Sequence, residues 1–153
     1  MTIFPFGSCP VPALEFIPPR PPMALVKSLE RAYGEGCIIC TVIPAGTMFI
    51  REDATVEPLV LLEIIAQACA VYGGWRTKDD SQGKQAAFLA GVSSFEIVGK
   101  AVADEPMEIT VTLLREFAGF HLFNGELRQG GYDVARASLK AYQPAATTTR
   151  LET

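Results

Sequence analysis

The chain of 153 residues is 49% hydrophobic and 20% charged, and it carries a net charge of −4 with a pI near 5.0. This length and composition predict one globular domain with a substantial hydrophobic core. The acidic balance and the lack of a Lys and Arg cluster argue against nucleic acid as the main partner, because phosphate binding needs concentrated positive charge.

Proline is concentrated in the first 22 residues, at Pro5, Pro10, Pro12, Pro18, Pro19, Pro21 and Pro22. Because proline interrupts regular helix, we predict an extended arm over residues 1–22, a folded domain over 23–143 and a flexible tail over 144–153. The first twelve residues contain no basic side chain and do not resemble a secretory signal, so we expect a cytoplasmic protein.

The first elements of the predicted domain are short. Residues 23–31 favour a helical turn or a strand, and the β-branched run 36–43 favours a strand. Within this second run, Cys37 and Cys40 form a C-x2-C pair without the further Cys or His ligands of a zinc site. We therefore interpret both as small strand residues and predict no metal site.

A polar loop over residues 51–57 leads to Pro58, which suits the first turn of a helix. Asp53 and Glu57 in this loop are typical of solvated side chains. The alternative is that one of them acts as an acid or base beside the helix.

The run 58–75 predicts a long, strongly apolar helix with one carboxylate, Glu63, and one amide, Gln67. Four residues apart, the two side chains share a helix face. Placing a carboxylate in an apolar helix is unfavourable unless it is hydrogen-bonded or has a chemical role, so Glu63 is our candidate catalytic group, with a purely structural role as the alternative. Gln67 would orient Glu63 or a water, or else pair with buried backbone.

The same run is about long enough to cross a membrane. Glu63 and Gln67 interrupt it, and Gly73 and Gly74 end it, so we predict a helix buried in protein and no membrane association.

Four strand-like runs follow the helix, over residues 86–98, 107–117, 120–128 and 132–142. Ala118–Gly119 and residues 129–131 are typical of hairpin turns. The pattern predicts an α+β fold in which a curved antiparallel sheet wraps one long helix. Such a sheet has an open edge, and dimerisation commonly covers it. His121, the only histidine, lies in the third of these runs, where we predict a structural role rather than a catalytic base.

Four segments resemble, in the right order, the hotdog-fold β-hydroxyacyl-(acyl carrier protein) dehydratases. They resemble more closely the dehydratase-like proteins of aryl-polyene biosynthesis clusters. The segments are IPPRPPMALVKSLE (17–30), LEIIAQACAVYGGW (62–75), FLAGVSSFEI (88–97) and ARASLKAYQP (135–144). The resemblance implies a hotdog fold, with the helix carried by the second segment at its centre.

The resemblance also implies a site shared between two subunits. In the family, a histidine on the loop before the helix removes the α-proton of a 3-hydroxyacyl thioester, and the helix carboxylate of the other subunit protonates the departing hydroxyl. The positions that match the catalytic pair are Glu63 and Gln67. The matching substrate-binding positions are Leu59, Val60, Phe88, Ala90, Gly91 and Val92.

The chain departs from the family pattern in the loop over residues 48–58, which contains no histidine and has Phe49 in the matching register. Pro58 stands where the family uses a backbone N–H as an oxyanion donor, and proline has none.

Three functions remain open: a dehydratase of fatty acid or polyene biosynthesis, a thioesterase that uses Glu63, and a non-catalytic partner of a histidine-bearing dehydratase. Each implies a thioester on phosphopantetheine, from an acyl carrier protein or CoA, with no other cofactor. Each also implies a homodimer, or a heterodimer with a dehydratase homologue.

Overall fold

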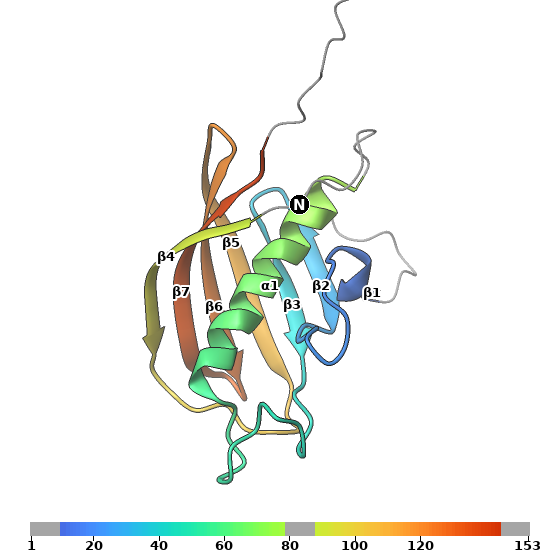
Figure 1. Cartoon of the computed structure of the whole chain (residues 1–153), viewed down its shortest axis with the longest axis vertical. Helices are drawn as coiled ribbons and strands as arrows, with labels where there is room; N and C mark the ends of the chain where they lie inside the picture. The colour runs from blue at the N-terminus through green and yellow to red at the C-terminus, as the bar shows by residue number, and fades with distance from the viewer. Residues whose placement is uncertain (1–9, 79–87, 145–153) are drawn as a thin grey trace, which may run out of the picture.

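The computed structural model describes residues 10–78 and 88–144. Within them, one α-helix lies across a curved seven-stranded antiparallel sheet (Figure 1). The elements are β1 (Val11–Pro12), the 3-10 turn η1 (Ala13–Glu15), β2 (Ser28–Tyr33), β3 (Gly36–Thr41), α1 (Pro58–Arg76), β4 (Phe88–Ile97), β5 (Met107–Phe117), β6 (Phe120–Gln129) and β7 (Tyr132–Tyr142). The strand order is β1-β2-β3-β5-β6-β7-β4, and the predicted α+β architecture is confirmed.

Two hairpins build the centre of the sheet at the predicted turns. Ala118 and Gly119, between β5 and β6, have φ of 50° and 85°, and Gly130 and Gly131, between β6 and β7, have φ of 59° and 81°. Successive positive φ values match the right-handed twist of the flanking strands, so these turns set the strand register. The register pairs Phe117 with Phe120 and reaches Met107 and Gln129, with one irregularity between Leu113 and Arg115.

The core lies between α1 and the inner face of the sheet. Met107, Ile109 and Val111, alternate residues in the first half of β5, are fully buried, as expected for a strand with one covered face. The helix approaches β6 so closely that a Cβ on Gly125 would lie 2.3 Å from the Ile65 methyl carbon Cγ2. The buried residues of α1 are Leu61, Ile64, Ile65, Gln67, Ala68, Cys69, Val71 and Tyr72. By length and composition α1 could cross a membrane, but this burial makes it the core helix of the fold.

Part of the predicted arm belongs to the packed structure. β1 extends the sheet by pairing with β2, and Ala13 and Ile17 are 0% and 3% exposed. The segment also crosses the carboxyl-terminal part of α1, where a Cβ on Gly74 would lie 2.3 Å from the Phe16 carbonyl oxygen. Residues 1–9, and all of the predicted tail except Pro144, lie outside the described residues.

Replacing Ala118 with Asn should stabilise the fold, because Asn tolerates positive φ better than Ala does. We expect the free energy of unfolding in urea to rise by about 0.5–1 kcal/mol. Ala45→Gly, in an exposed loop without positive φ, is the control and should give no increase. A destabilised Ala118→Asn variant would contradict the assigned turn.

Candidate functional site

The predicted pair on α1 is in contact. The Gln67 Nε2 donates a hydrogen bond to Glu63 Oε1 at 2.9 Å. Gln67 is only 5% exposed, and its amide also binds the segment before β2. Its Oε1 accepts a hydrogen bond from the Leu25 N–H at 2.8 Å, and its Nε2 donates to the Met23 carbonyl at 2.8 Å. Both roles considered for Gln67 are therefore present: it orients Glu63 and it pairs with buried backbone.

Glu63 itself lies on the exposed, outer face of α1. The sequence predicted a carboxylate on an apolar, buried helix. In the structure the Glu63 carboxylate is exposed, because it lies on the helix face that the sheet does not cover. Leu59, one turn before, is 71% exposed, and Ala70 is also exposed. These three residues share one face of the helix. Water can solvate an exposed carboxylate, so Glu63 needs no buried partner for its charge. The hydrogen bond from Gln67 therefore serves to orient the carboxylate.

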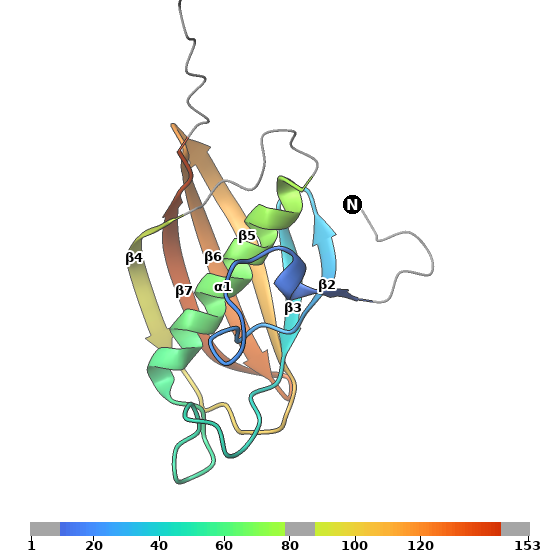
Figure 2. The ribbon, with the colours of Figure 1, turned by 45° about the vertical axis from the view of Figure 1, so that its right-hand side comes forward.

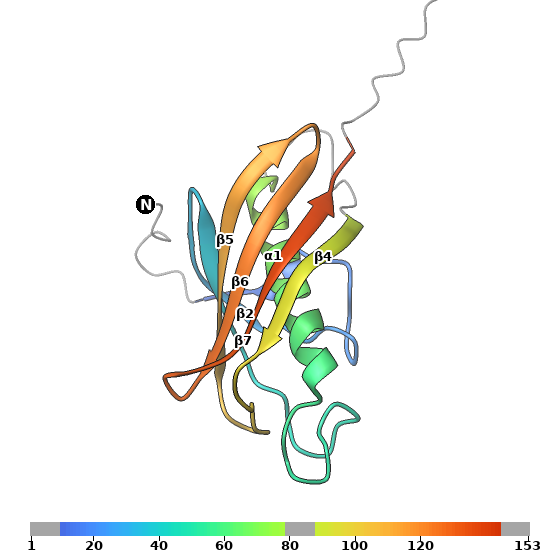
Figure 3. The ribbon, with the colours of Figure 1, turned by 90° about the vertical axis from the view of Figure 1, so that its left-hand side faces the viewer.

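A second exposed apolar region lies beside α1, on the edge strand β4. Leu89, Val92 and Ile97 pair with Ala141, Leu139 and Ala135 on the inner face of the sheet, and yet they are 52%, 42% and 45% exposed. Figures 2 and 3 show β4 at the edge of the sheet, on the side opposite β2.

We call these residues of α1 (Leu59, Glu63, Ala70) and β4 (Leu89, Val92, Ile97) the open face. Its apolar residues face solvent in the single chain, on two elements that are in contact, and exposed apolar surface is a feature of interaction sites.

The remaining predicted substrate-binding residues lie around this face in different ways. Val60 is half-buried on α1. Ala90 lies at an irregularity in the pairing of β4 with β7, and Gly91 pairs with Lys140. Phe88 pairs with Tyr142, and the Tyr142 ring packs at a tilt against the Phe120 ring on the outer face of the sheet. Of the predicted β4 residues, Val92 is the one that shares the inner face with the helix.

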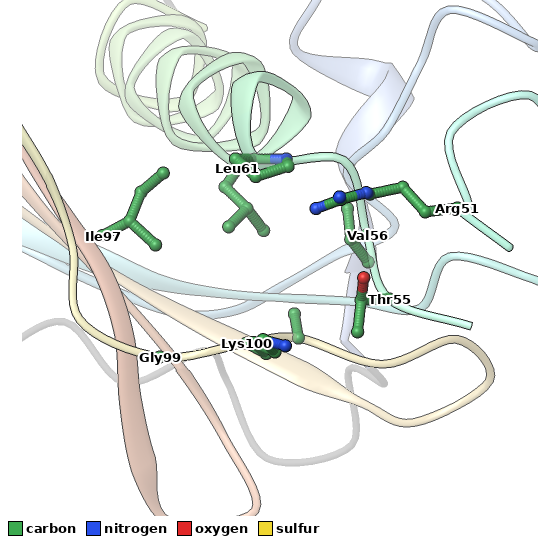
Figure 4. Close-up of a pocket in the computed structure, with 9 residues that line it drawn as sticks. Arg51, Thr55, Val56, Leu61, Ile97, Gly99 and Lys100 are labelled. Carbon is green, nitrogen blue, oxygen red and sulfur yellow. The ribbon is translucent and has the colours of Figure 1, made fainter. Parts of the chain in front are cut away.

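A cavity of about 290 Å³ opens at the start of α1 (Figure 4). Its walls are mostly apolar, and Arg51 and Lys100 add two cationic side chains. Ile97 belongs both to the cavity and to the open face, so the two are continuous. The lining residues are Arg51, Thr55, Val56, Pro58, Leu61, Ile97, Gly99, Lys100 and Ala101.

The loop before α1 is held by its own hydrogen bonds. Asp53 accepts hydrogen bonds from the Thr55 hydroxyl at 2.5 Å and the Thr55 N–H at 3.1 Å, and these bonds lower the pKa of Asp53. Glu57 is the residue before the helix, and its Oε2 lies 3.9 Å from the Arg51 Nε. Phe49, in the register of the family histidine, packs against the core. Asp53 thus has a structural role here, as an acceptor that closes the turn.

His121 belongs to an ion-pair cluster at the far end of the helix. Arg76 donates to both carboxylate oxygens of Glu116, at 2.5 and 2.9 Å, and the His121 Nε2 lies 2.9 Å from Glu116. The hydrogen bond from Arg76 lowers the pKa of Glu116, and the charges of Arg76 and His121 add to this effect. Arg76 lies thirteen positions after Glu63 on the helix, a distance of about 20 Å along the axis. His121 therefore lies far from Glu63, and it binds Glu116 of β5, which in turn binds Arg76 at the end of α1.

The three cysteines that the structure describes, Cys37, Cys40 and Cys69, do not form a site. Cys37 pairs with the buried Val111, and Cys40 pairs with the exposed Glu108, so the two lie on opposite faces of the sheet. Burial raises the pKa of Cys37 to about 12 and also raises that of Cys69, which keeps both as thiols. Among the described residues, no three His, Cys, Asp or Glu side chains are grouped as metal ligands would be.

The comparisons with known proteins agree with this geometry. A model of the ApeP-like family, described as ApeP dehydratase, matches residues 11–152. The chain belongs to the ApeP-like dehydratase family. The predicted resemblance to dehydratase-like proteins is thus confirmed. A search of curated proteins finds no match.

Solved structures confirm the hotdog fold of this family member. The dehydratase heterocomplex ApeI:P from Xenorhabdus doucetiae matches with a TM-score of 0.78 and 22% identity, over 90% of this chain and 93% of that one. The E. coli PaaI protein of the phenylacetic acid degradation operon matches with a TM-score of 0.61 and 13% identity, over 75% and 81% of the two chains. A hypothetical thioesterase from Streptococcus pneumoniae TIGR4 with coenzyme A matches with a TM-score of 0.61 and 10% identity, over 77% and 90%.

Sequence reasoning missed the cavity and the Arg76–Glu116–His121 cluster. The cavity joins the loop before α1 to the connection after β4, and the cluster joins α1 to the hairpin of β5 and β6. Neither has a local motif. The one available signal was the placement of Arg76 in the last turn of a helix, where a basic residue suits the helix dipole.

The cluster predicts an acid-dependent contribution to stability. The pKa of Glu116 is lowered in the fold, so its contribution is present above the unfolded Glu pKa of about 4.3 and is lost as pH falls through the lower, folded value. Glu116→Gln should therefore lower the melting temperature by a few degrees at pH 7, because exposed ion pairs are screened, and by less at pH 3. Melting temperatures of wild type and variant across this pH range test the prediction.

Glu52→Gln, in the exposed loop before α1, is the control and should show no such pH-dependent difference. An equal difference between wild type and Glu116→Gln at both pH values would contradict the assignment.

Proposed function

We propose that this chain is one subunit of a heterodimeric dehydratase and that it supplies Glu63 to a site whose base comes from the partner. One observation carries the proposal. The Glu63 carboxylate is exposed and is oriented by a hydrogen bond from Gln67, and no part of the described chain covers the open face. The family model matches a dehydratase, and the loop over residues 48–58 has no histidine to act as the base.

The reaction needs two groups. A base removes the α-proton of the 3-hydroxyacyl thioester, and an acid protonates the hydroxyl that leaves from the β-carbon, giving a 2-enoyl thioester and water. Glu63 would be the acid, and Gln67 would hold it in place. A partner that covers the open face would exclude water from this carboxyl group, which strengthens every electrostatic interaction in the site.

The edge strand β4 gives the partner a place to bind. An unpaired edge offers backbone donors and acceptors to a strand of another chain, and the open face adds apolar surface beside it. The similar Xenorhabdus doucetiae structure is itself called a dehydratase heterocomplex, which supports a heterodimer here. We propose a dehydratase homologue with the catalytic histidine as the partner.

The substrate would be an acyl thioester on phosphopantetheine, delivered by an acyl carrier protein or by CoA. The similar thioesterase from Streptococcus pneumoniae contains coenzyme A, which supports a thioester as the ligand class. Part of the acyl chain would enter the cavity at the start of α1, because its walls are apolar and it joins the open face at Ile97.

Thioester hydrolysis is the second candidate. It is favoured by the Glu63–Gln67 pair, which could direct a water without a histidine, and by the thioesterases among the similar structures. This reaction would need no histidine-bearing partner, so activity of the chain alone separates it from the dehydratase.

The test uses a 3-hydroxyacyl N-acetylcysteamine thioester, followed by mass spectrometry, with the chain alone and with a copurifying dehydratase homologue. We expect loss of water only with both subunits, and Glu63→Gln should reduce this turnover by about 100-fold or more because the acid is removed. Glu108→Gln, an exposed carboxylate on β5, is the control and should keep full activity.

Full dehydration by the complex that carries Glu63→Gln would reject Glu63 as the acid. Release of free thiol by the chain alone would establish the thioesterase instead.

A further inference from the structure

Thr41, the last residue of β3, is buried with 1% exposure and uses its hydroxyl for one specific contact. Its Oγ1 donates a hydrogen bond to the carbonyl oxygen of Leu25 at 2.5 Å. Leu25 lies sixteen residues earlier, in the irregular segment that leads into β2. A buried hydroxyl bound to a buried carbonyl fixes the segment at that point, because breaking the bond leaves both groups unpaired.

Leu25 is fixed from its other side by the helix. Its N–H donates to Gln67 Oε1, and the nearby Met23 carbonyl accepts from Gln67 Nε2, both at 2.8 Å. The same short segment is therefore held between Thr41 on the sheet and Gln67 on α1.

These contacts fix the orientation of the Gln67 amide. Turned over, its NH2 group would face the Leu25 N–H, and its oxygen would face the Met23 carbonyl, so both contacts would become repulsive. In the observed orientation one Nε2 proton goes to Met23 and the other to Glu63 Oε1 at 2.9 Å. The direction of the Glu63 carboxylate is thus set by backbone that Thr41 holds.

We propose that Thr41 is a positioning residue for Glu63, acting through the backbone of Leu25 and the side chain of Gln67. This inference rests on the proposed role of Glu63 as the acid, and it adds a residue on another element to that site. Glu63 is exposed and has a long, flexible side chain, so a single direction requires an external restraint. A chain of satisfied hydrogen bonds that begins on the sheet supplies one.

Thr41→Val tests the proposal, because Val has nearly the shape of Thr and lacks the hydroxyl. The Leu25 carbonyl then loses its donor. The Lys27 N–H still binds the Cys40 carbonyl at 3.2 Å, so we expect a local shift at Leu25, and Gln67 follows it. Thr41→Ser keeps the hydroxyl and should behave as wild type. Thr112→Val, the same change on β5 at a half-buried position, is the matched control.

Two measurements are made on each variant. Hydrogen exchange of the Gln67 side-chain NH2, followed by NMR, reports the restraint without any need for activity, and we expect it to become severalfold faster in Thr41→Val alone. In the complex with the histidine-bearing homologue, kcat for dehydration of the 3-hydroxyacyl N-acetylcysteamine thioester should fall roughly 10-fold, with KM changed less than about 2-fold, because small misplacements of a catalytic group are costly.

A purely structural role gives a different result. Thr41→Val would then have a lower melting temperature, with wild-type Gln67 exchange and a wild-type kcat per folded complex, and the proposal would be overturned. Faster Gln67 exchange in Thr112→Val as well would overturn it too, because the effect would not be specific to Thr41. If Glu63→Gln keeps full activity, the proposed function fails, while the exchange measurement still decides whether Thr41 restrains Gln67.

Discussion

The buried carboxamide of Gln67 joins three parts of this molecule. It pairs with the backbone of Met23 and Leu25, it anchors α1 to the segment that enters the sheet, and it holds Glu63. An amide in an apolar core is tolerated only when its groups are paired, so the helix has to meet this segment in one register. The placement of α1, the entry into β2 and the direction of the single exposed carboxylate on the helix all depend on that requirement.

The Glu63 carboxylate belongs to the open face, whose apolar side chains are exposed in the single chain. The sheet covers one side of α1 and ends at β4. There, the inner-face side chains Leu89, Val92 and Ile97 remain partly exposed. In a single chain this surface exposes apolar groups and an unpaired strand edge, which are the features that another subunit covers. The dehydratase family and the absence of a histidine from the loop over residues 48–58 support our proposal that the chain supplies the acid of a shared acid–base pair.

Local sequence was enough to predict the helix and the four strands after it, but not β1 or the 3-10 turn, which lie in the segment predicted as an extended arm. The predicted helix over residues 58–75 is observed as Pro58–Arg76, and the turns at Ala118–Gly119 and residues 129–131 are where glycine and alternating apolar residues placed them. Helix periodicity, proline and glycine act over a few residues, so one sequence shows them directly.

The contacts that define the site could not be predicted from local sequence, because they join residues far apart in the chain. The bond from Leu25 to Gln67 spans 42 residues, and the position of β4 at the edge depends on the order of all seven strands. Whether Glu63 is buried or exposed depends on which face of α1 the sheet covers, and the spacing of Glu63 and Gln67 does not contain that information. His121 is a similar case, because its partner Glu116 is set by the hairpin register and Arg76 reaches both from the helix.

The most direct test of this account is a crystal structure of the chain with its histidine-bearing dehydratase homologue, bound to an unreactive 3-hydroxyacyl thioester analogue. We predict that the partner covers the open face by pairing with β4. We also predict that the Glu63 carboxylate lies within hydrogen-bond distance of the substrate hydroxyl and that the partner's base faces the α-carbon. A complex that leaves Glu63 in solvent, or that forms through another surface, would contradict the claim that this chain completes a shared active site.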